Sequence, residues 1–393
     1  MAVILSTELG EHVTAHSLWP QLAREETTQA QHSAIDLPWN QQGSRQAAAL
    51  VADVCSSVSA VRPPLISADA LVGSAVDWLT ADTSGTSGQH AGKQFVSPEV
   101  VEVLRDRIAQ LRRLDDSQGG PLILSWVIQD LRWAAMLVQN GSYDASTGLS
   151  LHGILAELAQ LAGWLASDQG QAGLGQRLLL IGLHAAHTAG DAALGANIVS
   201  CLSYQAMWAG NQQGALRLVR LARKGAGKLQ RGRVPALLAT RQARAHALLR
   251  DDTACAKALD EAAAAYDGGA GSEDPSWAYW VTGAVLAADA GRAWLELNRP
   301  DLAAENLMRG LELFGEAQPR NRMLHNASLA EARLALGDLD GAVLAAHDAL
   351  NLAEQLISGR AYVRLRVMQA GFAAIDSPLS REVVGRTKGA LEQ

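Results

Sequence analysis

Apolar residues recur at helical spacing along most of this chain, and no segment alternates in the way a half-buried strand would. Between residues 173 and 346 the helical segments are separated by turns at 189–191, 209–211, 250–252, 298–301 and 336–338. Asn211 and Asp251 lie 40 residues apart, and Asp301 and Asp338 lie 37 apart. Repeats of roughly 34–47 residues are typical of α-solenoids, in which hairpins stack because one hairpin cannot bury its own apolar face. The pattern predicts an all-α fold: a right-handed tetratricopeptide-like solenoid with an irregular N-terminal extension.

The first part of the chain does not continue this repeat. Residues 81–93 (ADTSGTSGQHAGK) are rich in Ser, Thr and Gly and are typical of a linker. We therefore predict an N-terminal extension at 1–93 and a helical-repeat domain at 94–393. Within the extension, 46–60 is expected to be a helix, and 71–79 a short helix or extended piece that docks through Trp78.

Local signals place the helices of the repeat domain. Ser97-Pro98-Glu99 combines a capping serine, a proline at the first helical position and an acid in the first turn. Later helices are predicted at 122–139, 149–167, 173–188, 192–208, 212–224, 234–249, 254–266, 277–297, 302–314, 322–336, 341–356, 361–374 and 380–391.

Composition narrows the class of protein. A net charge of −7 argues against a freestanding nucleic-acid-binding protein, which is more often basic. Three scattered cysteines are too few for a disulfide framework or a zinc site. No run of about 18 apolar residues and no signal peptide is present in the sequence, so a soluble cytoplasmic protein without membrane contact is expected.

Several segments resemble a known family in their order and spacing. These are LAQLAGW at 158–164, LHAAHTAGDAAL at 183–194, RAHALL at 244–249, DPSWAYW at 274–280 and LAEARLALGD at 329–338. They resemble actinobacterial (Streptomyces-type) transcriptional regulators, which join an N-terminal helix-turn-helix to a C-terminal tetratricopeptide-like sensor region. The resemblance covers about residues 70–390, and residues 5–20 are similar to the exit from the DNA-binding domain.

The same resemblance bears on DNA binding. A helix-turn-helix needs two helices, the second of which enters the major groove, and nothing upstream of Leu5 supplies them. The helix-turn-helix is therefore expected to be missing or truncated, or lost along with DNA binding. The resemblance implies a sensing or partner-binding role, and direct DNA binding is not expected.

A basic run is the most unusual local feature, because no acid occurs between Asp191 and Asp251. One interpretation is a seat for an anionic ligand through bidentate guanidinium contacts. The alternative is a solvated face that balances acidic neighbours, namely Asp251, Asp252, Glu261 and Asp274. The run comprises Arg217, Arg220, Arg223, Lys224, Lys228, Arg231, Arg233, Arg241, Arg244 and Arg250.

Ten tryptophans are many for this composition. Rings on predicted helices could line a pocket for a planar or hydrophobic guest, or could fill space between helix layers beside small alanines. His184 and His187 lie at i, i+3, but no third metal ligand has matching spacing nearby. No nucleophile elbow or phosphate-binding loop is present, so no catalytic residue, metal or cofactor is predicted.

These patterns lead to one functional prediction. The chain is expected to be a sensor that binds a small molecule or peptide in its concave groove, tied to transcriptional control of secondary metabolism. A protein–protein interaction scaffold and a biosynthetic enzyme evolved from the sensor are the alternatives, and a protein partner or homodimer is a further candidate. The predicted ligand-lining residues are Trp133, Tyr204, Trp208, Arg241, Arg244, Tyr279, Trp280 and Asn326.

Overall fold

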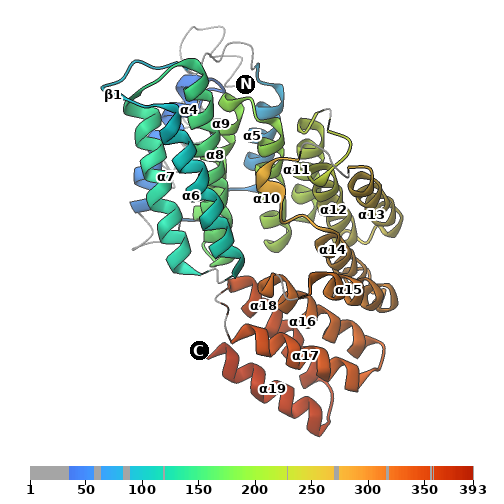
Figure 1. Ribbon diagram of the computed structural model, residues 1–393. Helices are drawn as coiled ribbons and strands as arrows, with labels where there is room; N and C mark the ends of the chain where they lie inside the picture. The colour runs from blue at the N-terminus through green and yellow to red at the C-terminus, as the bar shows by residue number, and fades with distance from the viewer. Residues whose placement is uncertain are drawn as a thin grey trace, which may run out of the picture.

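The computed structural model describes residues 35–56, 63–82, 89–117, 120–227, 229–269, 274–315, 318–354, 356 and 358–392. Residues 5–20, on which part of the family resemblance depends, lie outside the described residues. The described chain is almost entirely helical (Figure 1), which confirms the predicted all-α class. Its helices are α4 (Gln41–Ser56), α5 (Ala68–Thr80), α6 (Pro98–Ser117), α7 (Pro121–Asn140), α8 (Ala145–Asp168), α9 (Ala172–Ala189), α10 (Ala192–Trp208), α11 (Gln212–Gly225), α12 (Arg233–Leu248), α13 (Asp252–Asp267), α14 (Gly283–Glu296), α15 (Pro300–Phe314), α16 (Pro319–Ala335), α17 (Leu339–Ala353), α18 (Gly359–Ala373) and α19 (Pro378–Leu391).

The helices form hairpins that stack in sequence order. α8 packs on α9, α10 on α11, α12 on α13, α14 on α15, α16 on α17 and α18 on α19. The first helix of each hairpin also contacts the first helix of the next, from α8 through to α18. This succession is an α-solenoid, as the repeat spacing predicts. The even-numbered helices form its inner wall.

A short left-handed turn followed by a capping side chain recurs between these helices. Gly190 has a φ of 70°, and Asp191 accepts a hydrogen bond from the Leu194 backbone N–H at 2.8 Å. The cap satisfies one of the backbone donors that every helix start leaves free. The same pairing of a positive-φ residue with a capping Asp or Asn occurs at Gly210-Asn211, Arg250-Asp251 and Gly337-Asp338. The turn signals in the sequence therefore have a common physical basis.

The predicted N-terminal extension contains two regular helices that belong to the stack. α4 packs on α7 and α9, and α5 packs on α11. Trp78 of α5 is buried, as its predicted docking role requires. A Cβ added at Gly195 would lie 2.6 Å from the Trp78 ring, and one added at Gly225 would lie 2.1 Å from it. These two glycines leave the space that the indole occupies between α10 and α11.

The end of the predicted linker is also tied to the stack. β1 (Gln94–Phe95) pairs in parallel with β2 (Gly141–Ser142), and His90 forms an antiparallel bridge with Tyr143. These pairs attach the chain before α6 to the connection between α7 and α8.

One helix begins later than the sequence predicts. The segment from Trp277 was expected to continue a helix to residue 297, but α14 starts only at Gly283, where the Thr282 hydroxyl accepts from the Val285 N–H at 3.4 Å. Before it, Pro275 leads into a single 3-10 turn, Ser276–Ala278. Tyr279 and Trp280 therefore lie on a loop, not on a helix.

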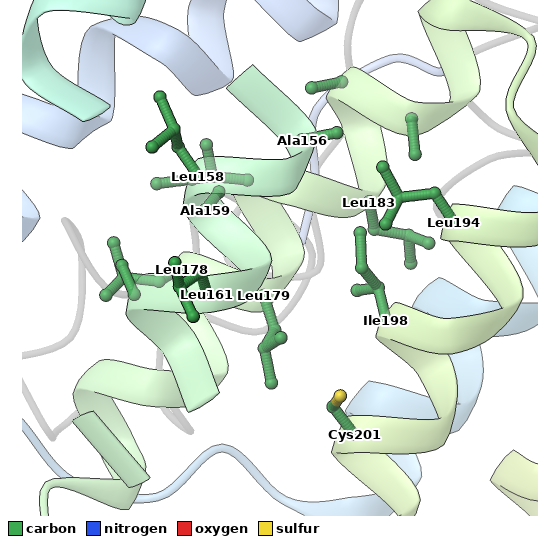
Figure 2. Packing of buried hydrophobic residues seen from close by; sticks show 14 of the residues in the cluster. Ala156, Leu158, Ala159, Leu161, Leu178, Leu179, Leu183, Leu194, Ile198 and Cys201 are labelled. Carbon is green, nitrogen blue, oxygen red and sulfur yellow. The ribbon is translucent and has the colours of Figure 1, made fainter. Parts of the chain in front are cut away.

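Two large apolar clusters hold the stack together. The first joins α4 to α12, and the second joins α15 to α19. Figure 2 shows Leu158 and Leu161 of α8 among the leucines of α9, with Ile198 of α10 beyond them. α7 and α8 are long and apolar enough to cross a membrane, by length and composition alone, but 56% and 72% of their most apolar stretches are buried inside the protein. Burial of that kind is typical of core helices.

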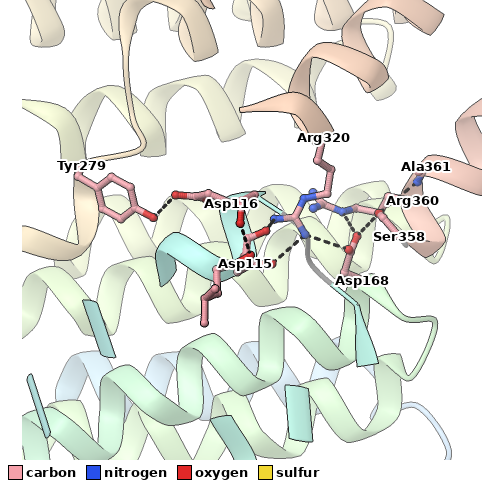
Figure 3. A network of polar contacts seen from close by, with 10 residues as sticks. Asp115, Asp116, Asp168, Tyr279, Arg320, Ser358, Arg360 and Ala361 are labelled. Atoms are coloured by element: carbon pink, nitrogen blue, oxygen red, sulfur yellow. Dashed lines mark hydrogen bonds and ion pairs between the residues drawn. The ribbon is translucent and has the colours of Figure 1, made fainter. Parts of the chain in front are cut away.

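The two ends of the stack meet through buried ion pairs (Figure 3), which we call the latch: Asp115, Asp168, Arg320, Ser358 and Arg360. Arg320 Nη1 donates to Asp115 Oδ1 at 2.9 Å and to Asp168 Oδ2 at 3.3 Å. Asp168 also accepts from Ser358 Oγ at 2.9 Å and from Arg360 Nε. The starts of α16 and α18 are thereby held against the last turns of α6 and α8, so the solenoid curls back on itself.

Candidate functional site

Three cavities lie along the inner wall where these helices face one another. The central cavity, about 100 Å³, is bounded by Trp164, Tyr204, Arg241, Tyr279, Trp280, Asp289, Arg292, Arg320 and Arg360, among others. The arginine cavity, about 320 Å³, is bounded by Tyr204, Trp208, Arg244, Arg292, Glu296, Glu331, Val363 and Arg364, among others. The tryptophan cavity, about 310 Å³, is bounded by Leu65, Trp164, Ala172, Tyr204, Trp208, Arg360 and Val363, among others.

Tyr204 of α10 lines all three cavities. Its ring centroid lies 5.3 Å from that of Trp164 and 6.2 Å from that of Trp208. The guanidinium carbon of Arg241 lies 4.3 Å from the Tyr204 centroid, and that of Arg360 lies 4.5 Å from the Trp164 centroid. Both distances are within the range of cation–π attraction. Alternating rings and guanidiniums thus build the wall between the cavities.

The guanidiniums determine the ionisation of Tyr204. Burial alone would raise its pKa, but Arg292, Arg360, Arg244 and Arg241 together outweigh burial and lower the pKa of Tyr204 to about 6. A negative charge is therefore favoured at this point of the inner wall, whether it belongs to the phenol or to another group placed beside it.

Arg241 and Arg244 lie one turn apart on α12 and are both buried. Among the described residues Arg241 forms no ion pair within 4.0 Å, although it is the guanidinium that does most to lower the pKa of the buried Asp289 carboxyl, and its Nε has no hydrogen-bond partner. Arg244 Nη2 reaches Glu296 Oε1 only at 3.4 Å, while its Nε and Nη1 have no partner. Burial, reinforced by Arg292, lowers the pKa of Arg244 to about 10. Buried guanidinium donors without partners are costly, so an acceptor supplied by a guest would stabilise them.

Groups of both charges line the arginine cavity. Three guanidiniums, those of Arg244, Arg292 and Arg364, face two carboxylates, those of Glu296 and Glu331. Arg364 pairs closely with Glu331. Burial raises the pKa of Glu331 although Arg364 opposes this, so that carboxylate holds its negative charge less firmly. Arg292 lies 3.8 Å from the Asp289 carboxylate, and Tyr204, whose pKa is lowered to about 6, adds a further negative charge at the cavity wall. The charges around the cavity therefore nearly balance, while two nitrogens of Arg244 remain without a hydrogen-bond partner.

A loop closes one side of the central cavity. The Tyr279 hydroxyl donates to the Asp116 carboxylate at the end of α6, as Figure 3 shows. Burial raises the pKa of Tyr279, and the hydrogen bond to Asp116 adds to the rise, so the phenol stays protonated and remains a donor. This contact links the loop before α14 to the helix that carries the latch residue Asp115.

Most of the predicted ligand-lining residues lie at these cavities. Tyr204, Arg241, Tyr279 and Trp280 line the central cavity, and Tyr204, Trp208 and Arg244 line the arginine cavity. The other two lie elsewhere. Trp133 is 40% exposed on α7, on a helix face that also exposes Leu122, Trp126 and Met136, and Asn326 is buried on α16 but is not among the residues that line the three cavities.

Several cavity residues were not predicted from the sequence: Trp164, Asp289, Arg292, Arg320, Arg360 and Arg364. A signal did exist for two of them. Asp289 and Arg292 are the only charged residues within the alanine-rich segment 283–295, and they lie one turn apart. Arg320 and Arg360 carry no such signal. They lie at the starts of α16 and α18, and their partners Asp115 and Asp168 lie at the ends of α6 and α8, far away in the sequence.

The basic run divides into two groups in the structure. Arg217, Arg220 and Lys224 are exposed on α11. Arg223 pairs with Glu261 at 2.7 Å and Arg233 with Asp274 at 3.6 Å, so two of the acidic neighbours named from the sequence do balance it. Arg241 and Arg244 form the other group and face the cavities. Helical spacing in the sequence likewise puts Arg217, Arg220 and Lys224 on one helix face and Arg241 and Arg244 on another.

His184 and His187 pack around an aromatic side chain. Trp39 stacks on His184 with the ring centroids 4.0 Å apart and meets the edge of His187 at 5.7 Å. Across the part of the chain that the structure describes, no group of three His, Cys, Asp or Glu side chains is placed to hold a metal ion.

Comparison with known proteins adds no assignment. No protein-family model matches the chain, and no curated protein matches it.

Proposed function

We propose that this chain is a ligand-sensing protein similar to the tetratricopeptide-like sensor region of helix-turn-helix regulators, tied to transcriptional control of secondary metabolism. A small molecule or peptide binds at the inner wall and shifts the curvature of the stack. The observation that carries this proposal is Arg241, a buried guanidinium that forms no ion pair within 4.0 Å among the described residues and is stacked on Tyr204 at the edge of a cavity. Its Nε has no hydrogen-bond partner, which is costly to the empty protein and favourable to an anionic or polar guest.

The arrangement of the ends supports a response to binding. In the latch, Arg320 contacts Asp115 and Asp168, which lie 205 and 152 positions earlier in the chain. Arg320 and Arg360 belong to the latch and also line the central cavity. A guest that contacts these residues would bind the closed and open stacks with different affinities. Only such a difference can shift the population of the two states. Three free, buried cysteines suit the reducing cytoplasm, which we propose as its location.

Thermal stabilisation by candidate ligands tests the proposal. A compound present at about 100 times its dissociation constant should raise the free energy of unfolding by ~2.7 kcal/mol. We expect at least one member of a panel of secondary metabolites and short peptides to do this with the wild-type chain, and to do so less well with Arg241→Gln. If no member stabilises the protein, the sensor proposal is wrong and an interaction scaffold becomes the better account.

A further inference from the structure

The arginine cavity and the tryptophan cavity share one boundary. Tyr204, Trp208 and Val363 line both of them, so the two spaces lie on either side of the same three side chains. Each measures slightly more than 300 Å³, at the lower end of the range for small-molecule sites. Trp208 and Val363 are 40% and 42% exposed, so the shared boundary is also where a guest can enter.

The two sides of this boundary differ in chemistry. On the tryptophan side, Leu65, Trp164, Ala172 and Trp208 provide apolar surface. The two charged residues there, Asp168 and Arg360, already pair with each other in the latch. On the arginine side, Arg244 retains two buried donor nitrogens without a partner.

We propose that the two cavities together bind a small amphipathic carboxylic acid. Its carboxylate lies against Arg244 and Arg292, and its aromatic or aliphatic body lies between Trp164, Trp208 and Val363. This proposal rests on the proposed function and narrows it to one ligand class. Arg244 supplies buried donors that have no acceptor, which is the requirement for a strong charge-assisted hydrogen bond to a carboxylate.

Charge and shape favour this class over others. One carboxylate can accept from the two unpartnered nitrogens of Arg244, whereas a diphosphate would place several negative charges beside Glu296 and Glu331. Arg241, whose guanidinium carbon lies 4.3 Å from the Tyr204 centroid, adds positive potential that Asp289 offsets in part. An extended peptide would need a continuous groove, but the cavities are short and lie inside a stack whose ends the latch holds together.

Matched probes test the charge requirement without any mutation. Decanoate and naphthoate are compared with decanol and naphthalenemethanol, and binding is followed by tryptophan fluorescence, because Trp164 and Trp208 line the site. We expect each acid to bind the wild-type chain about ten- to hundredfold more tightly than its alcohol, which is the size of a hydrogen bond to a charged group.

Two variants locate the two halves of the site. Arg244→Gln should weaken binding of the acids about ten- to hundredfold and leave the alcohols nearly unchanged. Val363→Trp should weaken binding of acids and alcohols alike, because it fills the shared boundary. Arg220→Gln, an exposed arginine on α11, is the matched control and should change neither. Circular dichroism and thermal melting check that each variant is folded, and Arg364→Gln replaces Arg244→Gln if the latter does not fold.

The outcomes separate this inference from the proposed function. If acids and alcohols bind the wild-type chain equally, or if neither Arg244→Gln nor Arg364→Gln changes acid binding, the carboxylate site is wrong. If an uncharged compound or a peptide stabilises the protein while both acids fail, the sensor proposal survives and the ligand class does not. If nothing in either panel binds, both proposals fail.

Discussion

At the scale of single residues, Tyr204 decides the chemistry of the inner wall. The side chain lies at the boundary of all three cavities, and four guanidiniums surround it from α12, α14 and α18. The guanidiniums that act on it are those of Arg292, Arg360, Arg244 and Arg241. Other charged and titratable groups line the same cavities, namely Arg112, Asp115, Asp116, Asp168, Cys201, Tyr279, Asp289, Glu296, Arg320, His325, Glu331 and Arg364. The positive groups outweigh burial, so the deprotonated form is favoured.

The ionisation of Tyr204 can be measured directly. The difference in tyrosinate absorbance between the wild type and Tyr204→Phe should appear with a midpoint near pH 6, because the pKa is lowered to about 6. Arg292→Gln should move that midpoint upward, because Arg292 is the guanidinium that does most to lower the pKa of Tyr204 against the effect of burial. A midpoint near the ordinary tyrosine pKa of about 10 would show that the guanidiniums do not control this phenol.

The same pKa shift gives stability a pH dependence. Because the folded pKa of Tyr204 is lower than the unfolded value, the unfolded chain binds more protons between these two pH values. The phenolate's contribution to stability is therefore fully present above the unfolded pKa and is lost as the pH falls through about 6. In Tyr204→Phe this part of the pH dependence should be absent.

Individual site residues were predicted unevenly from the sequence. Tyr204, Trp208, Arg241 and Arg244 lie on inner helices, where helical spacing and the absence of nearby acids made them conspicuous. Helical spacing also predicts Trp133, which is instead 40% exposed on α7, because spacing identifies a helix face without showing which way that face points. Arg360 depends on contacts across 192 positions and could not be identified from local pattern.

At the scale of elements, local signals predicted helix positions well where a capping side chain or turn marks the boundary. α10 has the bounds that the sequence predicts, because Gly190 and Asp191 mark its start. The sequence predicts a helix from Trp277, but α14 begins at Gly283. Apolar residues continue at helical spacing through the loop that starts at Pro275 and ends at Thr282, the capping residue of α14, so spacing alone did not reveal the loop. That error matters for function, since the loop carries Tyr279 and Trp280 to the central cavity.

The docking of α5 is a testable element-scale contact. Trp78 fills space that Gly195 and Gly225 leave open on α10 and α11. Trp78→Ala should reduce the free energy of unfolding by about 3–5 kcal/mol, which is typical of removing a buried tryptophan. Trp126→Ala, at an indole that is 46% exposed on α7, is the matched control and should have a much smaller effect in the same denaturant titration. Equal losses would mean that α5 does not belong to the core.

At the scale of the whole molecule, two large apolar clusters are joined by smaller apolar clusters at α12 to α15 and, at the inner wall, by polar contacts. One apolar cluster spans α4 to α12 and the other spans α15 to α19, while the latch connects their inner helices. Repeat spacing predicted the stacking but gave no information about closure, because closure depends on distant helix ends. A Cβ at Gly359 would lie 2.4 Å from the Asp168 carbonyl oxygen, which shows how closely α18 approaches α8.

The latch should control both stability and shape. Asp168→Asn removes the carboxylate shared by Arg320 and Arg360, and breaking a buried ion pair in this way typically costs about 3–5 kcal/mol. We expect a lower melting temperature and a larger radius of gyration by small-angle scattering. Asp69→Asn removes an exposed pair with Arg217 and should change neither quantity appreciably. Unchanged scattering in Asp168→Asn, with the protein still folded, would mean that other contacts hold the ends together.

The latch also predicts an acid limit. Burial would raise the pKa of Asp168, but Arg360 and Arg320 outweigh burial and the pKa is lowered. Its contribution to stability is therefore present above the unfolded carboxyl value of about 3.9 and is lost as the pH falls below that value. The radius of gyration of the wild type should rise over this acid range.

The most direct test of the account is to locate a bound guest. Crystals of the protein grown with bromonaphthoate would reveal the bromine by anomalous scattering. We predict a bromine peak inside the tryptophan cavity, between Trp164 and Val363, with the carboxylate on the Arg244 side of Trp208. Bromine peaks confined to the outer helices, with both cavities empty at saturating ligand, would contradict the claim that the inner wall of this solenoid is a binding site for an organic acid.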